Sequence, residues 1–178
     1  MNIEPVRRVL DALGAPYALI GAHAMAARGY PRFTVDIDLL TTDSRVLDRT
    51  TWKTIEGEGG SVDPRRGDDD DPLGGVVHIL LPEGTDIDIV LGRWKWEAAV
   101  IERSERLPVA PGVTLPVPTL SDLILLKLAA GGFLDLHDAA ALLETGERAT
   151  LEAEVESRIA DVRPDIRPAW RDLLSRLG

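Results

Sequence analysis

Apolar and polar residues follow two different periods along the chain, and the period changes near residue 117. Before that point, short apolar or β-branched runs are separated by glycine, proline and aspartate, which is typical of strands joined by turns. After it, apolar residues recur at helical spacing. The pattern predicts an α/β (α+β) protein, with a small mixed sheet flanked by helices over residues 1–117. A helical C-terminal region over residues 118–178 is expected to pack on this core.

The predicted elements can be placed by residue number. In the first part we expect helices over 3–13, 22–28 and from Asp43 or Ser44 to about Ile55, and strands over 17–20, 35–40, 76–81 and 86–91. Residues 57–75, rich in glycine and aspartate, are interpreted as a solvated loop, and 107–117 as holding one short edge strand. In the second part we expect helices over 120–130, 134–143, 151–161 and from Pro164 to about Leu177.

Two carboxylates are the first candidate for chemistry. Asp36 and Asp38 lie two residues apart in an apolar segment, and side chains two apart on a strand project from the same face. Unpaired carboxylates at this separation repel each other, and a divalent cation with hard oxygen ligands, such as Mg²⁺, would neutralise them. The alternative is a half-exposed edge strand with a solvated acidic face.

Three further features strengthen the metal and phosphate interpretation. Gly21 ends one predicted strand and opens a helix, where backbone N–H groups can face a phosphate. Asp86 and Asp88 share one face of a later strand. Lys127 lies in an otherwise apolar helix, where the alternative is a lysine whose stem is buried and whose amine reaches water.

Composition narrows the classes of function. The chain has 20 lysines and arginines against 30 aspartates and glutamates, a formal net charge of -10, so a broad nucleic-acid-binding surface is not expected. A small patch could still receive an RNA end. The absence of cysteine excludes disulfides, thiolate catalysis and zinc–thiolate sites. No apolar run is long enough for a membrane span and the N-terminus has no signal-peptide pattern, which predicts a cytoplasmic protein without a membrane partner.

The ordered set of motifs resembles the nucleotidyltransferase superfamily, which has the polymerase-β-like fold. Its pattern is an apolar residue before G-[GS], a short helix, h-D-h-D-h, and a third carboxylate on a later strand. The matching segments are Ile20-Gly21-Ala22, Val35-Asp36-Ile37-Asp38-Leu39 and Ile87-Asp88-Ile89. Gly21-Ala22-His23-Ala24, Gly29, Arg32 and Thr34, together with Thr119 to Ala129 and Asp135-Leu136-His137-Asp138, are similar to the small bacterial branch that includes AbiEii-type toxins of type IV toxin–antitoxin systems. The resemblance covers about residues 15–145.

The resemblance implies transfer of a nucleoside monophosphate from an NTP to a hydroxyl acceptor, with Mg²⁺ or Mn²⁺ as cofactor. The acceptor would be an RNA such as a tRNA end, a protein or a small molecule, and a cognate toxin or antitoxin would be a further partner. The implied metal ligands and catalytic residues are Asp36, Asp38 and Asp88, with Asp86 as the alternative to Asp88. The implied nucleotide contacts are Gly21, Ala22, Arg32 and Lys127, with Asp135 and Asp138 supporting Lys127 and His23 either touching the nucleotide or packing.

Two residues depart from the family pattern. Ala22 replaces a glycine or serine, which removes a hydroxyl donor or the conformational freedom of glycine. Leu134 stands where a basic residue often precedes the aspartate. A second hypothesis is therefore a catalytically degenerate protein of this fold that acts as a regulatory or toxin–antitoxin partner. A third is an unrelated α/β domain, in which the three aspartates would not converge.

Overall fold

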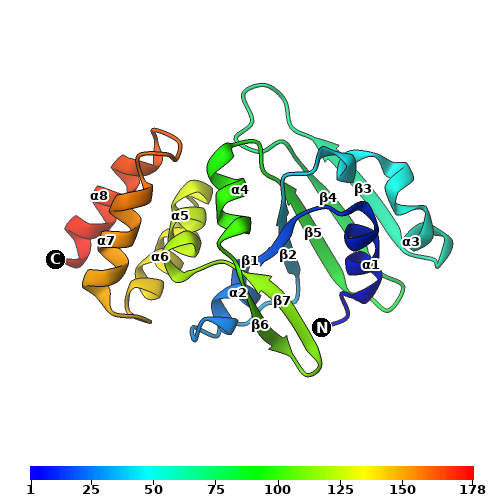
Figure 1. Cartoon of the computed structure of the whole chain (residues 1–178), viewed down its shortest axis with the longest axis horizontal. Coiled ribbons are helices and arrows are strands. Elements are labelled where there is room, and N and C mark those ends of the chain that lie inside the picture. The colour runs from blue at the N-terminus through cyan, green and yellow to red at the C-terminus, as the bar shows by residue number, and fades with distance from the viewer.

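The centre of the molecule is a five-stranded mixed sheet (Figure 1), seen in a computed structural model that describes residues 1–178. The strand order is β1-β2-β5-β4-β3, with β1 at Tyr17–Ile20, β2 at Ile37–Thr41, β3 at Ser61–Arg66, β4 at Gly75–Leu80 and β5 at Asp86–Leu91. Neighbouring strands are antiparallel except β2 and β5, which run parallel. A separate antiparallel hairpin consists of β6 (Glu105–Ala110) and β7 (Val113–Val117). The predicted fold class is confirmed.

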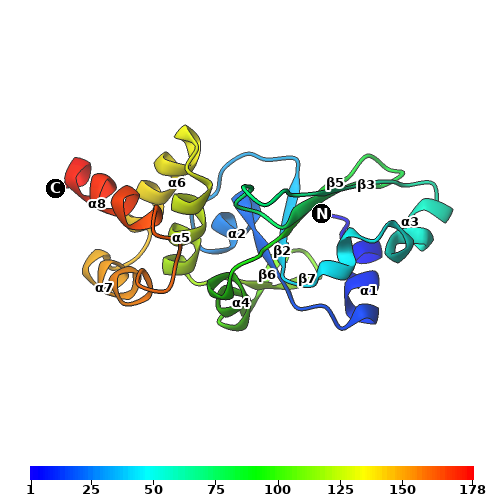
Figure 2. The same ribbon diagram turned by 90° about the horizontal axis from the view of Figure 1, so that it is seen from above.

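The helices lie on two sides of this sheet. Figures 1 and 2 place α1 (Glu4–Leu13) and α3 (Lys53–Gly57) against one face, with α4 (Lys95–Glu102) following β5. The short α2 (Gly21–Ala27) follows β1 directly. Beyond α2 and α4 lie the C-terminal helices α5 (Leu120–Ala130), α6 (Phe133–Leu143), α7 (Arg148–Arg158) and α8 (Ile166–Leu177).

Residues at the helix ends explain why some boundaries were predictable. Gly14 ends α1 in the left-handed conformation, which glycine adopts without steric cost. The Thr119 side chain accepts a hydrogen bond from the Asp122 backbone N–H at the start of α5, and Gly131 ends that helix with φ of 69°. The predicted helix over 120–130 is accordingly confirmed at both ends.

Four predictions about local structure were wrong, two of them in the segments before and after α3. Residues 57–75 are not one solvated loop, because β3 lies within them as the edge strand of the sheet; its exposed polar side chains and Pro64 conceal the strand pattern. The segment after Asp43 forms two 3₁₀ turns, Ser44–Leu47 and Arg49–Trp52, before α3, because Asp43 and then Asp48 each cap a new turn.

The other two errors concern strand boundaries near the candidate site and before α5. The strand predicted over 35–40 begins only at Ile37, so Asp36 lies just before β2. Residues 107–117 hold parts of two paired strands rather than one, since Pro111-Gly112 turns the chain between β6 and β7. The helix α4 was not predicted, and its Trp96 packs in the core.

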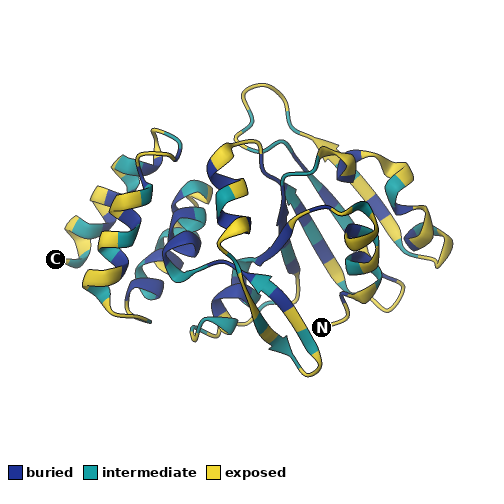
Figure 3. Cartoon of the chain, viewed as in Figure 1, coloured by how far each residue is buried: buried dark blue, intermediate teal, exposed yellow.

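One hydrophobic cluster of 42 buried residues runs from Ile3 to Leu173. It includes side chains from the sheet and from α5 to α8, and Figure 3 shows the buried positions continuing from one part into the other. The division at residue 117 therefore separates two patterns of secondary structure that share a core, and as a domain boundary it stays a prediction. None of the helices is both long enough and apolar enough to cross a membrane.

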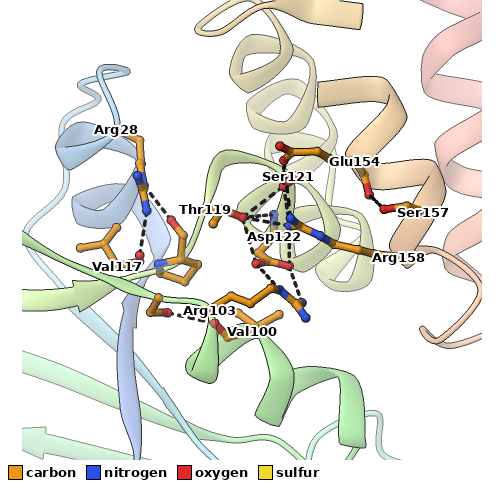
Figure 4. A network of polar contacts seen from close by, with 12 residues as sticks. Arg28, Val100, Arg103, Val117, Thr119, Ser121, Asp122, Glu154, Ser157 and Arg158 are labelled. Atoms are coloured by element: carbon orange, nitrogen blue, oxygen red, sulfur yellow. Dashed lines mark hydrogen bonds and ion pairs between the residues drawn. The ribbon is translucent and has the colours of Figure 1, made fainter. Parts of the chain in front are cut away.

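A buried carboxylate connects these parts (Figure 4). Asp122 on α5 is inaccessible to solvent, and it accepts hydrogen bonds from Arg103 Nε at 3.0 Å and Nη2 at 2.7 Å. Arg158 on α7 lies 3.1 Å from the same carboxylate, and the Thr119 hydroxyl donates to it at 2.9 Å. Nearby, Arg28 donates to the carbonyl oxygens of Val117 and Pro118. Two guanidinium groups thus compensate the burial of one carboxylate.

Candidate functional site

Asp38 and Asp88 face each other across two parallel strands. The register of β2 and β5 pairs Asp38 with Asp88, and in a parallel sheet paired residues project from the same face. Asp86 lies two residues before Asp88 on the same face, and it has no paired residue on β2 because that strand begins at Ile37, opposite Ile87. The register therefore favours Asp88 over Asp86 as the partner of Asp38, and it argues against a domain in which the aspartates lie apart.

Gly21, at the end of the adjacent strand β1, lies directly against the Asp38 carboxylate. Ile20, the last residue of β1, is paired with Asp38, and Gly21 follows it with φ of 64°. A Cβ atom at residue 21 would lie 2.0 Å from Asp38 Oδ2, so no larger residue fits unless the carboxylate moves. The glycine predicted at this turn is required both by its conformation and by its contact with the carboxylate.

Gly21→Ala is expected to destabilise the protein clearly more than Gly14→Ala does. Both glycines have φ of 64°, but nothing lies within 4 Å of a Cβ added at Gly14. Gly14→Ala therefore measures the left-handed conformation alone, about 1–2 kcal/mol. The collision with Asp38 should add roughly 1 kcal/mol or more. Urea denaturation of both variants makes the comparison, and the excess should shrink in an Asp38→Ala background; equal costs for the two glycines would contradict this account.

The surroundings of Asp38 raise its pKa to about 6. Burial is the main cause, and the neighbouring charges of Asp88 and Asp36 act in the same direction. Lys127 and Arg32 oppose the rise. Asp38 thus lies within electrostatic range of four other residues that the sequence analysis named. The two positive charges among them do not fully stabilise its ionised form.

Lys127 is held by two carboxylates of α6. Its Nζ atom lies 2.8 Å from Asp135 Oδ1 and 2.8 Å from Asp138 Oδ2. Burial alone would lower the pKa of Lys127, but its interactions with the Asp135 and Asp138 carboxylates outweigh burial and raise the pKa, so the amine is charged. Arg32 reaches the same cluster, with Nε 3.5 Å from Asp138 Oδ2. The predicted support of Lys127 by Asp135 and Asp138 is present in the structure.

A histidine that sequence reasoning missed contacts the candidate third carboxylate. His78 on β4 is paired with Asp88, and its Nδ1 lies 2.5 Å from Asp88 Oδ1. Because a carboxylate only accepts, Nδ1 carries the proton. Asp38, Asp88 and His78 therefore form a row across β2, β5 and β4. The apolar alternation around His78 predicts a strand. It does not show that this strand pairs with β5 and brings His78 next to Asp88.

The remaining candidates differ in how they are placed. Ala22 is buried in α2, and His23 is half-buried with its pKa lowered, mainly by burial. Asp36 is exposed in the segment before β2. No group of three or more histidine, aspartate or glutamate side chains is arranged to hold a metal ion by itself. The assignment of Asp36, Asp38 and Asp88 as metal ligands therefore stays a prediction.

Asp38 and Asp88 nevertheless fit a hard cation. Both offer carboxylate oxygens from one sheet face, and their mutual repulsion is not neutralised. Magnesium in particular is commonly held by one or two carboxylates together with substrate phosphates and water, rather than by a complete cage of side chains. An incomplete ligand set is therefore consistent with a site that closes only when substrate supplies the remaining oxygens.

Comparison with known proteins gives no match to any family model, and no curated protein matches the sequence. Solved structures do match. The solution structure of the antibiotic-resistance factor ANT(2'')-Ia is 19% identical, with a TM-score of 0.57 over 89% of this chain and 91% of that chain. Its crystal structure in complex with adenylyl-2''-tobramycin is 18% identical, with a TM-score of 0.53 over 88% and 96%.

A third structure with the same arrangement is a putative nucleotidyltransferase (TM1012) from Thermotoga maritima. It is 15% identical, with a TM-score of 0.50 over 72% of this chain and 84% of that chain. Identities this low establish shared architecture and nothing finer, so the likeness to the AbiEii branch stays a prediction. On the strength of its mixed sheet, its flanking helices and these three matches, the chain has the nucleotidyltransferase fold.

Proposed function

We propose that this chain is a cytoplasmic, Mg²⁺-dependent nucleotidyltransferase that moves a nucleoside monophosphate from an NTP to a hydroxyl acceptor. The observation that carries the proposal is the in-register pair Asp38 and Asp88, next to a glycine whose missing Cβ leaves room for the Asp38 carboxylate. A structural role alone gives no reason to keep two repelling carboxylates side by side at a cost in stability.

In this proposal Asp36, Asp38 and Asp88 are the catalytic residues and hold the metal. Mg²⁺ bound there would neutralise charge on the phosphates and activate the attacking hydroxyl. Asp88 would hold the ion that activates this hydroxyl. The backbone at Gly21 and Ala22 would approach the triphosphate, and Lys127 and Arg32 would offer positive charge to it.

The class of acceptor is also part of the proposal. The complex of ANT(2'')-Ia with adenylyl-2''-tobramycin supports a small hydroxyl compound as acceptor. A tRNA end or a protein hydroxyl, as in a toxin–antitoxin system, rests on the motifs around His23 and Lys127. A catalytically degenerate regulatory or toxin–antitoxin partner is the alternative, and Ala22 is the residue that favours it.

Calorimetric titration of each NTP with Mg²⁺ into the wild-type protein and into Asp36→Ala/Asp38→Ala tests the proposal. Micromolar binding that disappears in the variant, followed by transfer of label from α-³²P-NTP to an acceptor, is the expected result. If the folded wild-type protein bound no NTP, the enzyme hypothesis would be rejected and the hypothesis of a regulatory or toxin–antitoxin partner would remain. Binding that is equal in the variant would place the nucleotide elsewhere.

His78→Leu is expected to reduce kcat by about 10- to 100-fold, the range typical of residues that orient metal ligands. It removes the hydrogen bond to Asp88 and leaves that carboxylate free to rotate. His78→Asn keeps an N–H donor at a similar reach and should retain most of the activity with unchanged KM for the NTP. Steady-state kinetics and the affinity for Mn²⁺ distinguish the variants; equal loss in both would show that Asp88 is positioned by something else.

A further inference from the structure

Both phenylalanines of this chain lie on its surface. The sequence contains only two, Phe33 and Phe133, and they are 89% and 87% exposed. Val35 and Leu134 are largely exposed as well, and these four residues, the apolar patch, are the most exposed large apolar residues of the protein. Burial of a phenylalanine normally stabilises a fold, so an exposed group of this kind indicates a surface that another molecule covers.

The apolar patch comes from two segments that lie together beside the candidate site. Residues 31–36 connect α2 to β2, and Figure 2 shows this connection running along the outside of the molecule, with α6 at one end. Arg32 Nε, 3.5 Å from Asp138 Oδ2, joins the connection to α6. Phe133 and Leu134 are the first two residues of that helix.

The connection over residues 31–36 has free backbone groups. No backbone hydrogen bond joins it to any other part of the chain. Phe33 and Val35 are exposed, whereas Thr34 between them is half-buried and Arg32 reaches inward to α6, so apolar side chains point outward and polar ones inward. An exposed segment with unpaired N–H and C=O groups and an apolar outer side is a template for pairing with a strand of another chain. The segment bends at Val35 and must straighten to pair, but its backbone has no hydrogen bonds to lose.

The order of residues around Thr34 is complementary to itself. If two copies of the segment pair antiparallel with Thr34 opposite Thr34, Arg32 of each copy lies opposite the partner's Asp36, and Phe33 lies opposite the partner's Val35. Opposite charges, and an aromatic residue beside a β-branched one, are both favourable cross-strand neighbours. A shift of one residue in either direction would lose both charge pairs.

Charge and area favour a second copy as the occupant of the apolar patch. With one arginine and one aspartate, residues 31–36 do not attract a polyanion such as RNA, but they complement a copy of themselves. An aromatic side chain buries roughly 150–250 Å², so the two phenylalanines of each copy would together supply about 600–1000 Å². Val35, Leu134 and the paired backbones would bring the total to about the 1200 Å² at which stable interfaces begin.

We propose that residues 31–36 pair antiparallel with the same residues of a second copy, and that the protein is a two-fold symmetric dimer joined through the apolar patch. Directly opposite residues in such a pair have Cβ atoms about 5 Å apart. The partner's Arg32 therefore lies beside Asp36, just before β2, and each candidate site is bordered by a cation from the other copy. The inference goes beyond the proposed function and does not require nucleotide binding.

Sedimentation equilibrium of the ligand-free protein over a range of concentrations tests the dimer. The wild-type protein is expected at twice the mass of one 19.4 kDa chain. Arg32→Asp and Asp36→Arg each place like charges opposite one another twice in the dimer, and each should weaken association about tenfold or more. An equal mixture of the two variants restores both attractive pairs and should associate about as tightly as wild type.

The apolar contribution is tested separately. Phe33→Ser should weaken association, whereas Leu80→Ser, at an exposed apolar residue outside the apolar patch, is the matched control and should not. Circular dichroism establishes that each variant is folded before its association is measured.

Three results would overturn the proposal. A folded wild-type protein that remains monomeric up to millimolar concentration would exclude the dimer, and a shift with a single-stranded RNA oligonucleotide that Phe33→Ser abolishes would then assign the apolar patch to RNA. A dimer that neither Phe33→Ser nor the charge reversals weaken would use another surface. Charge-reversed variants that stay monomeric when mixed would exclude the proposed pairing. Because no nucleotide is present, none of these results depends on the NTP titration that tests the proposed function.

Discussion

Asp38→Asn is expected to lower nucleotidyl transfer by about a thousandfold or more while raising the melting temperature of the ligand-free protein. A metal-bound carboxylate supplies several kcal/mol of transition-state stabilisation, and each 1.36 kcal/mol corresponds to about a tenfold change in rate. The asparagine keeps the shape of the side chain beside Gly21 but removes the charge that repels Asp88 and Asp36.

The gain in stability has a defined pH dependence. The pKa of Asp38 is raised from 3.8 to about 6 in the folded protein, so the folded state binds the proton more tightly than the unfolded state. Ionisation of Asp38 therefore destabilises the wild-type protein progressively as the pH rises from about 4 to about 6. The difference in melting temperature between Asp38→Asn and wild type should be small near pH 4 and fully developed above pH 6. Discounted for partial exposure, it is about 1 kcal/mol, or roughly 3 °C.

Thermal unfolding of both proteins at pH 4, 5, 6 and 8, with and without Mg²⁺, makes this measurement. Magnesium should stabilise the wild-type protein more than Asp38→Asn, because it compensates the same repulsion. A variant that is less stable than wild type at pH 8 without metal would contradict the electrostatic account, whatever its activity.

Lys127→Met is expected to reduce both stability and NTP affinity, and a second substitution separates the two effects. Asp138 is 3% exposed and would lose its nearest cation. Breaking a buried ion pair on one side costs about 3–5 kcal/mol, or roughly 10 °C in melting temperature for a chain of this length. Lys127→Met/Asp138→Leu removes both charges and should recover most of that loss.

Nucleotide binding decides whether Lys127 has a role beyond this ion pair. If the amine contacts the triphosphate, the stable double variant should bind NTP as poorly as Lys127→Met does. Recovery of wild-type NTP affinity in the double variant would assign Lys127 a purely structural role. Lys53→Met, at an exposed lysine outside the site, is the control for loss of a single positive charge.

The sequence predicted the strands that carry the candidate site more reliably than the elements around them. The segments at Tyr17–Ile20 and Asp86–Leu91 have strong apolar patterns and were placed correctly, since buried strands leave a clear signal. Strand β3 was missed because an edge strand with a polar outer face has the composition of a loop. The helix α4 was missed because Trp94-Lys95-Trp96 carries no helical period within so short a segment.

Contacts between distant segments could not be predicted from the periodic patterns of the sequence. The glycine at residue 21 was predicted as a turn, but its contact with Asp38 depends on the pairing of β1 with β2. His78 joined Asp88 only through the register of β4 and β5. Lys127 was noticed because a charged residue in an apolar helix is costly, and its partners Asp135 and Asp138 followed from the family motif, so this part of the site was predictable.

The shared carboxylate of Asp122 sets the smallest fragment of this chain that can be expected to fold. The family-like motifs end near residue 145, and a fragment trimmed to them would still contain Asp122 and Arg103. It would lack Arg158, which lies 3.1 Å from the buried carboxylate, and Glu154, whose Oε2 accepts the Ser121 hydroxyl at 2.6 Å. Such a fragment should be recovered mainly as aggregate, whereas one that extends through α7 and α8 keeps both contacts and the core residues that α8 contributes. Motif boundaries and folding boundaries therefore differ here by two helices.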